Sequence, residues 1–349
     1  MDAAERRGTA ETNGGTRFVS LGFGRIEERT VLGVLLGIHG KDPEGGLWQI
    51  AAEDLEEALS QTRSAVRKAV VFLRDTALFP HISLLPSLGT LPILALFFHE
   101  HSAPSPRTRQ LLTRWSWRRA VQSSQGTATR SWQQTIRAGF PRNEDEAVQR
   151  LLGDVSTAPL KKSVPLRFDP QSADTKLHLA ALAALHPRHL VTGEEIDIAA
   201  LCETPGGPAS PLSSEQARLA SQILHPRLEE SQLRSRLAEC TDEEVLSSHL
   251  IAAKSREALR QNNLSSFLDR REEDLQRYIE DFLQSKAEWN ASDRDRPALA
   301  SLIVADESAG TEADQSFIPS ATPSDGQQRL KFSLAGAQLK LSALQRGDR

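Results

Sequence analysis

Eight arginines and three tryptophans lie between residues 104 and 143, a segment that contains no Asp or Glu. The segment carries +8, so the remainder of the 349-residue chain carries −12 within the total of −4 at pH 7. Arginine binds phosphate oxygens and an exposed aromatic ring stacks on a base, so the pattern is typical of a nucleic-acid contact. The candidate contact residues are Arg107, Arg109, Arg114, Trp115, Trp117, Arg118, Arg119, Arg130 and Trp132.

The same residues have a second interpretation, in which the tryptophans anchor the core and the arginines pair with acidic helices elsewhere. If the segment forms one exposed face, DNA binding should be weak, salt-sensitive and indifferent to base sequence. If the segment packs inside, no such binding is expected. The sequence leaves both interpretations open.

Histidine and cysteine spacing gives no metal or catalytic site. His186 and His189 are three residues apart and could share a metal on a helix, whereas His99 and His101 point to different faces. No third ligand is near either pair, so surface or capping roles are predicted. No nucleophile set or Walker loop stands out. The sequence therefore predicts no metal, no cofactor and no catalytic residue.

Cysteine content and the absence of long apolar runs indicate the cellular compartment. The two cysteines, Cys202 and Cys240, are too few for a disulfide framework and favour a reducing environment. The first residues lack the apolar stretch of a secretory signal, and no later run approaches the ~20 apolar residues of a membrane span. A soluble, cytoplasmic protein with no membrane partner is predicted.

Helical periodicity dominates the elements that must position these residues. Residues 53–75 have an amphipathic pattern, and residues 84–101 are apolar on all sides, which is typical of a central helix that Pro92 starts or kinks. Because alternating patterns are scarce, we expect a mainly α, compact multi-helix domain. Further helical patterns cover residues 106–122, 143–155, 173–185, 213–224, 241–251 and 265–285.

Composition also divides the chain. No Leu, Ile, Val or aromatic residue precedes Phe18, so residues 1–17 are predicted to be a disordered tail. A helical region with the Arg/Trp-rich segment follows over 18–160, and a second helical region over 161–300. Residues 301–330 are acidic and rich in Ser, Gly, Ala and Pro, as in a disordered linker. Residues 331–349 form a short, β-like C-terminal tail.

Several phrases resemble, in order, the C-terminal half of GmrSD-type restriction and phage-defence proteins. They are "PHISLLPSLGTLPILALFFHEH", "RQLLTRWSWRRAV", "PRHLVTGEEIDI", "SSHLI" and "FLDRREEDLQRYIEDFL", and the resemblance covers about residues 20–300. Members typically carry an N-terminal ParB-like nucleotide-hydrolysing domain, which is not found in this sequence. The resemblance therefore implies a possible ParB-like or nuclease partner subunit.

The resemblance also implies an HNH nuclease element after "LVTGEEID", and this sequence departs from it there. The segment 198–228 has no paired His and supplies only His225, displaced from the family pattern. A one-metal nuclease needs a base and a ligand shell that converge on one phosphate. Nuclease activity from this chain is therefore not predicted.

The tail contains "SLAGAQLKLSAL", which resembles the phosphate-binding segment of HipA-type kinases. Ser333, Gly336, Gln338 and Lys340 match the small-residue loop and the lysine of that family. A kinase also needs a catalytic Asp and metal ligands further on. A truncated or rearranged gene remnant is the favoured interpretation. The alternative is a tail that docks on, or completes, a separate partner.

The expected function is that of a non-catalytic helical module of a GmrSD-type defence or restriction protein, as a truncated remnant that contacts DNA or partner subunits. The alternative is one part of a split enzyme, either a residual HNH nuclease or a HipA-like kinase fragment that a partner completes.

Overall fold

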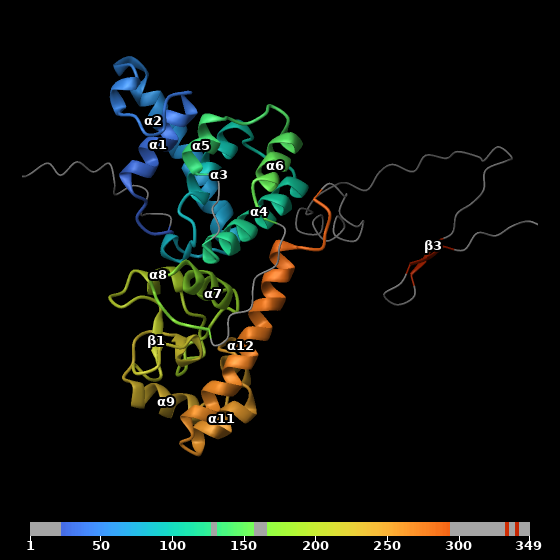
Figure 1. Cartoon of the computed structure of the whole chain (residues 1–349). Coiled ribbons are helices and arrows are strands. Elements are labelled where there is room, and N and C mark those ends of the chain that lie inside the picture. The colour runs from blue at the N-terminus through green and yellow to red at the C-terminus, as the bar shows by residue number, and fades with distance from the viewer. Residues whose placement is uncertain (1–21, 127–130, 157–165, 294–331, 335–338, 342–349) are drawn as a thin grey trace, which may run out of the picture. The chain divides into compact units, whose positions relative to one another are not determined.

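The computed structural model describes residues 22–126, 131–156, 166–293, 332–334 and 339–341, and these are mainly helical, as predicted (Figure 1). The chain divides into two units, Met1–Pro297 and Ala298–Arg349. The expected disordered segments, 1–17 and 301–330, lie outside the described residues. Among the described helices, none combines the length and apolar character needed to cross a membrane.

The central helix of the N-terminal half is α3 (Thr90–Glu100), against which α1 (Glu28–Ile38) and α2 (Leu55–Val71) pack. Residues 90–98 of α3 are all buried, which confirms the prediction of a helix that is covered on every side. Pro92 lies in the first turn and so begins the helix without a kink, because the N–H groups there need no partner within the helix.

Helix α4 (Pro106–Ser124) contains most of the Arg/Trp-rich segment, and α5 (Trp132–Arg137) and α6 (Glu144–Gly153) follow it. Ser105 caps α4 by accepting a hydrogen bond from the Thr108 N–H at 3.2 Å, with Pro106 at the first helical position. Helix α4 packs against α6, α7 (Ala173–Ala183) and α12 (Leu264–Ala287). It therefore contacts elements from both halves of the first unit.

The long helix α12 packs against α4, α7 and α11 (Ala253–Arg260). Its buried face includes Leu268, Leu275 and Ile279, as the sequence pattern predicts. The predicted helical patterns over 265–285 and 241–251 differ from the helix starts by a residue or two, since Asn263 caps α12 and Asp242 caps α10. The remaining elements are α8 (Ile198–Cys202), β1 (Ala209–Pro211), β2 (Gln222–Leu224), α9 (Glu230–Glu239) and α10 (Glu243–Ser248).

The helix predicted over residues 213–224 is wrong. Strand β2 ends this segment and pairs antiparallel with β1, with Ala209 opposite Leu224. The carbonyls of Ala220 and Gln222 accept hydrogen bonds from Arg271 Nη1 at 2.6 and 2.9 Å, so these carbonyls are satisfied without a helix. Tertiary hydrogen bonds thus override a weak local helical pattern.

The second unit contains a two-stranded hairpin, in which β3 (Phe332–Leu334) pairs antiparallel with β4 (Leu339–Leu341). This confirms the β-like tail. In the register of the hairpin Ser333 lies opposite Lys340. Gly336 and Gln338 of the kinase-like segment lie outside the described residues.

Candidate functional site

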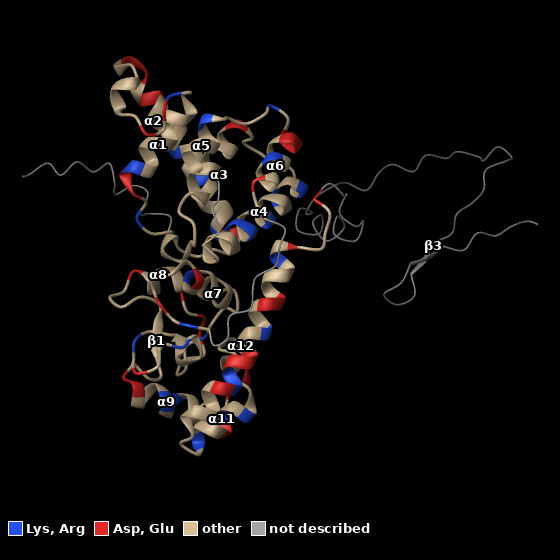
Figure 2. Ribbon diagram, in the orientation of Figure 1, with Lys and Arg blue, Asp and Glu red and all other residues tan. Residues whose placement is uncertain are grey.

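Most of the arginines proposed for nucleic-acid contact point into the fold. Arg114, Arg118 and Arg119 are only 2%, 1% and 3% exposed. Figure 2 shows basic positions of α4 beside the C-terminal end of α12. An exposed nucleic-acid face needs these side chains at the surface, so for these three residues that condition is not met. Replacing all three with Glu would bury three carboxylates, and so it would not test DNA binding.

The other candidate residues are dispersed. Arg107 is half-buried and donates to the Asp293 carbonyl at 3.4 Å, and Arg109 is exposed. Trp132 is half-buried and packs against the core, while Arg130 lies outside the described residues. The structure therefore does not gather the nine candidates on one surface.

The two tryptophans of α4 are core residues. Trp117 is fully buried, donates its Nε1–H to the Ala77 carbonyl at 2.9 Å and stacks on Phe79 with ring centroids 4.3 Å apart. Trp115 is 1% exposed and lies beneath the guanidinium of Arg119, 5.7 Å from the ring centroid. Both positions agree with the core-anchor interpretation.

The arginines of α4 hold the end of α12. Arg118 donates from Nε to the Ala287 carbonyl at 2.9 Å and from Nη2 to the Glu288 carbonyl at 3.0 Å. These carbonyls are at the C-terminus of α12, where they lack partners within the helix and carry the negative end of its dipole. The buried guanidinium of Arg118 therefore donates hydrogen bonds to the unpaired carbonyls at the end of α12.

Two carboxylates balance these buried charges. Asp293 accepts from Arg114 Nη1 at 2.6 Å and from Arg118 Nη1 at 2.7 Å, and Glu288 pairs with Arg114 Nη2. Burial raises the pKa of Asp293, but the hydrogen bonds from Arg114 and Arg118 outweigh burial and hold that pKa below its ordinary value. We call Arg114, Arg118, Glu288 and Asp293 the α12 latch.

The sequence contains a pattern from which the α12 latch could be predicted. Glu288 and Asp293 follow the end of the amphipathic pattern of α12, and Glu288 adopts a left-handed backbone with φ 44° that turns the chain there. Acidic residues just past a long helix, in a chain with an acid-free arginine helix, are natural partners for those arginines.

The histidine pair His186 and His189 does not form a site. Both follow α7, which ends at Ala183, and they line different cavities. His186 is exposed and bonds Glu195 through Nδ1 at 2.7 Å, whereas His189 stacks on His225 at 4.6 Å between ring centroids. The predicted surface role therefore holds for His186.

The region in which the resemblance implies a nuclease, residues 198–228, contains helix α8 and the short hairpin of β1 and β2. His225 follows β2, and its two ring nitrogens are engaged: Nε2 accepts from the Leu190 N–H at 3.2 Å and Nδ1 donates to the Pro226 carbonyl at 2.8 Å. Neither nitrogen is then available to a metal. Across the described part of the chain, no group of three or more His, Cys, Asp or Glu is arranged to hold a metal ion.

Because burial lowers the pKa of His249, we expect the fold to lose stability in acid. It donates from Nε2 to the Arg188 carbonyl at 2.7 Å, and burial, with the nearby charge of Arg271, lowers its pKa to about 4. In the unfolded chain His249 therefore binds a proton near pH 6.5, whereas in the folded chain it binds one only near pH 4. The free energy of unfolding therefore decreases as the pH falls below 6.5, and at pH 4 this loss amounts to about 3 kcal/mol. His178 and His225 act in the same direction, because burial lowers the pKa of each.

Urea titrations from pH 7 to pH 4 measure this effect. His249→Gln keeps a side-chain N–H for the Arg188 carbonyl and removes the titrating ring, so its unfolding free energy should fall less steeply with acid. Parallel profiles for the two proteins would contradict the assignment to His249.

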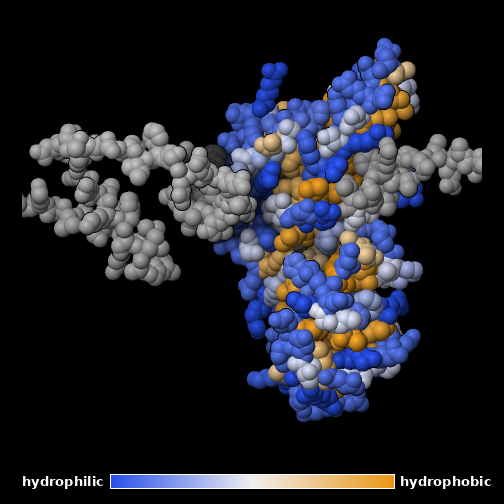
Figure 3. All heavy atoms as spheres, turned by 180° about the vertical axis from the view of Figure 1, so that it is seen from behind, coloured by the Kyte–Doolittle hydropathy of each residue, from blue (hydrophilic) through white to orange (hydrophobic). Residues whose placement is uncertain are grey.

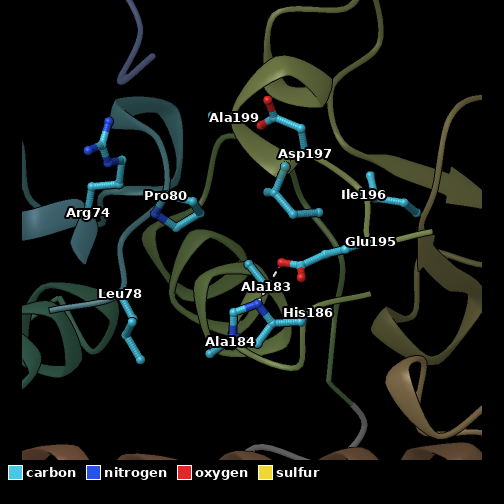
Figure 4. Close-up of a pocket in the computed structure, with 11 residues that line it drawn as sticks. Arg74, Leu78, Pro80, Ala183, Ala184, His186, Glu195, Ile196, Asp197 and Ala199 are labelled. Atoms are coloured by element: carbon cyan, nitrogen blue, oxygen red, sulfur yellow. Dashed lines mark hydrogen bonds and ion pairs between the residues drawn. The ribbon is translucent and has the colours of Figure 1, made fainter. Parts of the chain in front are cut away.

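A cavity of about 410 Å³ lies beside the His186–Glu195 pair (Figure 4). Glu195 bonds the Nδ1 of His186 at 2.7 Å, and both side chains line the cavity. Two lining residues, Leu78 and His186, have left-handed backbones with φ 62° and 53°, a strained conformation that clusters at functional sites. The described lining includes no Ser, Thr or Cys, so the pair can accept a proton but has no neighbouring nucleophile to activate.

Apolar side chains reach the surface in the connection between α1 and α2. Leu47 and Trp48 are 46% and 85% exposed. Figure 3 shows hydrophobic surface at the end of the molecule that α1 and α2 form. An exposed Trp is a residue type that often dominates protein interfaces.

No family model, no curated protein and no solved structure matches this chain.

Proposed function

We propose that the chain is a non-catalytic helical module that supports a partner subunit in a GmrSD-type defence or restriction system. The observation that supports this most is the α12 latch. Arg114 and Arg118, two of the arginines proposed to contact phosphate, are instead bonded to residues at and just past the end of α12, and Asp293 is also the last described residue before the second unit. The helix end from which the chain continues is thus fixed by buried charge.

The surface offers the contacts that a partner would need. Leu47 and Trp48 are exposed large apolar residues on a 3₁₀ turn, Leu47–Gln49, which lies between α1 and α2 in the chain and packs against α1. A ParB-like or nuclease subunit is the partner class that the family resemblance implies. Trp48→Ser removes the largest exposed ring with little expected effect on the core.

Phage plating on the host strain tests the proposal. Deleting the gene should raise the plating efficiency of phages that the host restricts, and the wild-type chain should restore restriction. Arg118→Met, which breaks the latch, and Trp48→Ser, which removes the exposed ring, should both fail to restore it. Arg109→Met is the matched control, because Arg109 lies on the same helix with an exposed side chain. Unchanged plating after deletion would contradict a defence role.

Activity assays on the purified chain test the non-catalytic part. With Mg²⁺ or Mn²⁺ the chain should leave supercoiled plasmid intact, and with labelled ATP it should transfer no phosphate. Plasmid cleavage, or phosphotransfer that Lys340→Ala removes, would favour the split-enzyme alternative. Retention on DNA that Arg109→Glu with Arg142→Glu abolishes would assign a DNA contact to the exposed arginines.

A further inference from the structure

A cavity of about 440 Å³ lies between α7 and the β1–β2 hairpin, and neither the resemblance nor the proposed function accounts for it. It is distinct from the cavity beside His186 and has different lining residues. Its volume falls in the range of ordinary small-molecule sites, about 300–1,000 Å³. The segments that line it come from residues 83–84, 168–179, 202–227 and no other described region.

Two cations line this cavity without partners. The side chain of Lys176, half-buried on α7, and that of Arg227, exposed just after β2, form no hydrogen bond or ion pair with residues 22–126, 131–156 or 166–293. The described lining contains no Asp or Glu. Arg114, Arg118 and Arg218 of the same unit, in contrast, bind carboxylates. An unmatched pair of cations in a concave site favours an anion.

Three carboxylates next to lining residues are engaged elsewhere. Glu230 accepts from the Ser214 N–H at 2.7 Å and faces Arg234, and Glu203 bonds His81 Nε2 at 2.8 Å. Asp169 accepts from the Gln171 N–H at 3.0 Å. None of the three lines the cavity, so none neutralises Lys176 or Arg227 inside it.

A glycine makes room for the arginine. Gly206 has φ +96°, and a Cβ added there would lie 2.5 Å from Arg227 Nη1. The guanidinium therefore rests against the backbone of residue 206, and a side chain there would displace it. Cys202, also in the lining, is a neutral thiol, because burial raises its pKa to about 11.

The rest of the lining suits an organic body. Phe168, Leu84 and Leu179 supply apolar and aromatic surface, and Gln216 and Gln222 supply amides that can donate and accept hydrogen bonds. Gln222 is only 7% exposed, so its side chain is held in place. A site with a few polar groups on apolar walls orients a small ligand.

We propose that this cavity binds a small phosphomonoester of about mononucleotide size, with Lys176 and Arg227 as the contacts for its phosphate. A phosphomonoester carries close to two negative charges at pH 7 and so matches two cations, whereas a single carboxylate matches one. Arginine adds a planar fork for two phosphate oxygens and lysine adds a point charge.

Calorimetric titration of the full chain tests this with four 5′-mononucleotides, the matching nucleosides and inorganic phosphate. At least one mononucleotide should bind more tightly than both its nucleoside and phosphate, and added salt should weaken it. Lys176→Met and Arg227→Met should each weaken binding by about ten-fold or more. Arg67→Met is the control and should leave the affinity unchanged, because Arg67 is exposed on α2 and does not line the cavity.

Circular dichroism and urea titration confirm that each variant is folded before binding is compared. Absence of mononucleotide binding, or equal binding by nucleoside and nucleotide, would overturn the proposal. So would an affinity that both Met variants retain. Equal affinity for phosphate and mononucleotide would support the charged contacts and overturn the role of the apolar wall.

Discussion

Arg118→Met should lower the unfolding free energy by about 3 kcal/mol, while Arg109→Met on the same helix leaves it unchanged. The side chain of Arg118 is fully buried, and its loss removes hydrogen bonds to the carbonyls of Ala287 and Glu288 and to the Asp293 carboxylate. The desolvation that Met relieves is smaller than this loss, because one oxygen of the Asp293 carboxylate and two helix-end carbonyls would lose their charged donor, although Arg114 still bonds the other oxygen. Guanidinium titrations of the two variants measure the difference.

Hydrogen exchange locates the same effect. Breaking the latch should speed exchange of backbone amides in the last turn of α12, around residues 284–288, more than in α3. Equal stability of the Arg118 and Arg109 variants would show that the latch contributes nothing. Uniformly faster exchange would show that it acts on the whole unit and not on the end of α12.

The helices were predictable because their information is local. Val66 and Val70 of α2 and Leu268 and Leu275 of α12 repeat on one face and are buried in the structure. Residues 213–224 were misassigned because the acceptors there bind Arg271, about fifty residues further along the chain. A window of local sequence cannot contain that partner.

The direction of the α4 arginines was not predictable for the same reason. Helix α4 carries charges that periodicity alone would place at the surface, yet the carboxylate that accepts from Arg114 and Arg118 lies 175 to 179 residues away in the sequence. The absence of acids in the segment fits both an exposed basic face and a set of distant partners.

The cavity that we assign to a phosphomonoester could not be predicted from the sequence either. Lys176 and Arg227 lie on separate segments, and nothing in their spacing brings them together. Only the hairpin that replaced the predicted helix places them in one cavity. Gly206 was the available signal, since a Gly-Gly step commonly marks a backbone with positive φ.

Arg271→Met should lower the unfolding free energy by about 2–4 kcal/mol and act mainly on the β1–β2 hairpin. The guanidinium is fully buried and donates to the carbonyls of Ala220, Gln222 and His249 at 2.6 to 3.3 Å. Burial lowers its pKa to about 10, so the group is still charged at neutral pH and its desolvation opposes folding. Two effects compete in the variant: Met relieves that desolvation, and three buried carbonyls lose a charged donor.

We expect the loss of donors to win, because each orphaned buried carbonyl costs about 1–3 kcal/mol and three are involved. Arg271→Lys separates the effects, since it keeps a buried charge but cannot reach three acceptors in different directions. It should be at least as destabilising as Met. Urea titration ranks the two variants, and hydrogen exchange over residues 209–224 reports the hairpin. A Met variant more stable than the wild type would show that desolvation dominates and that Arg271 serves the orientation of the hairpin at a net loss of stability.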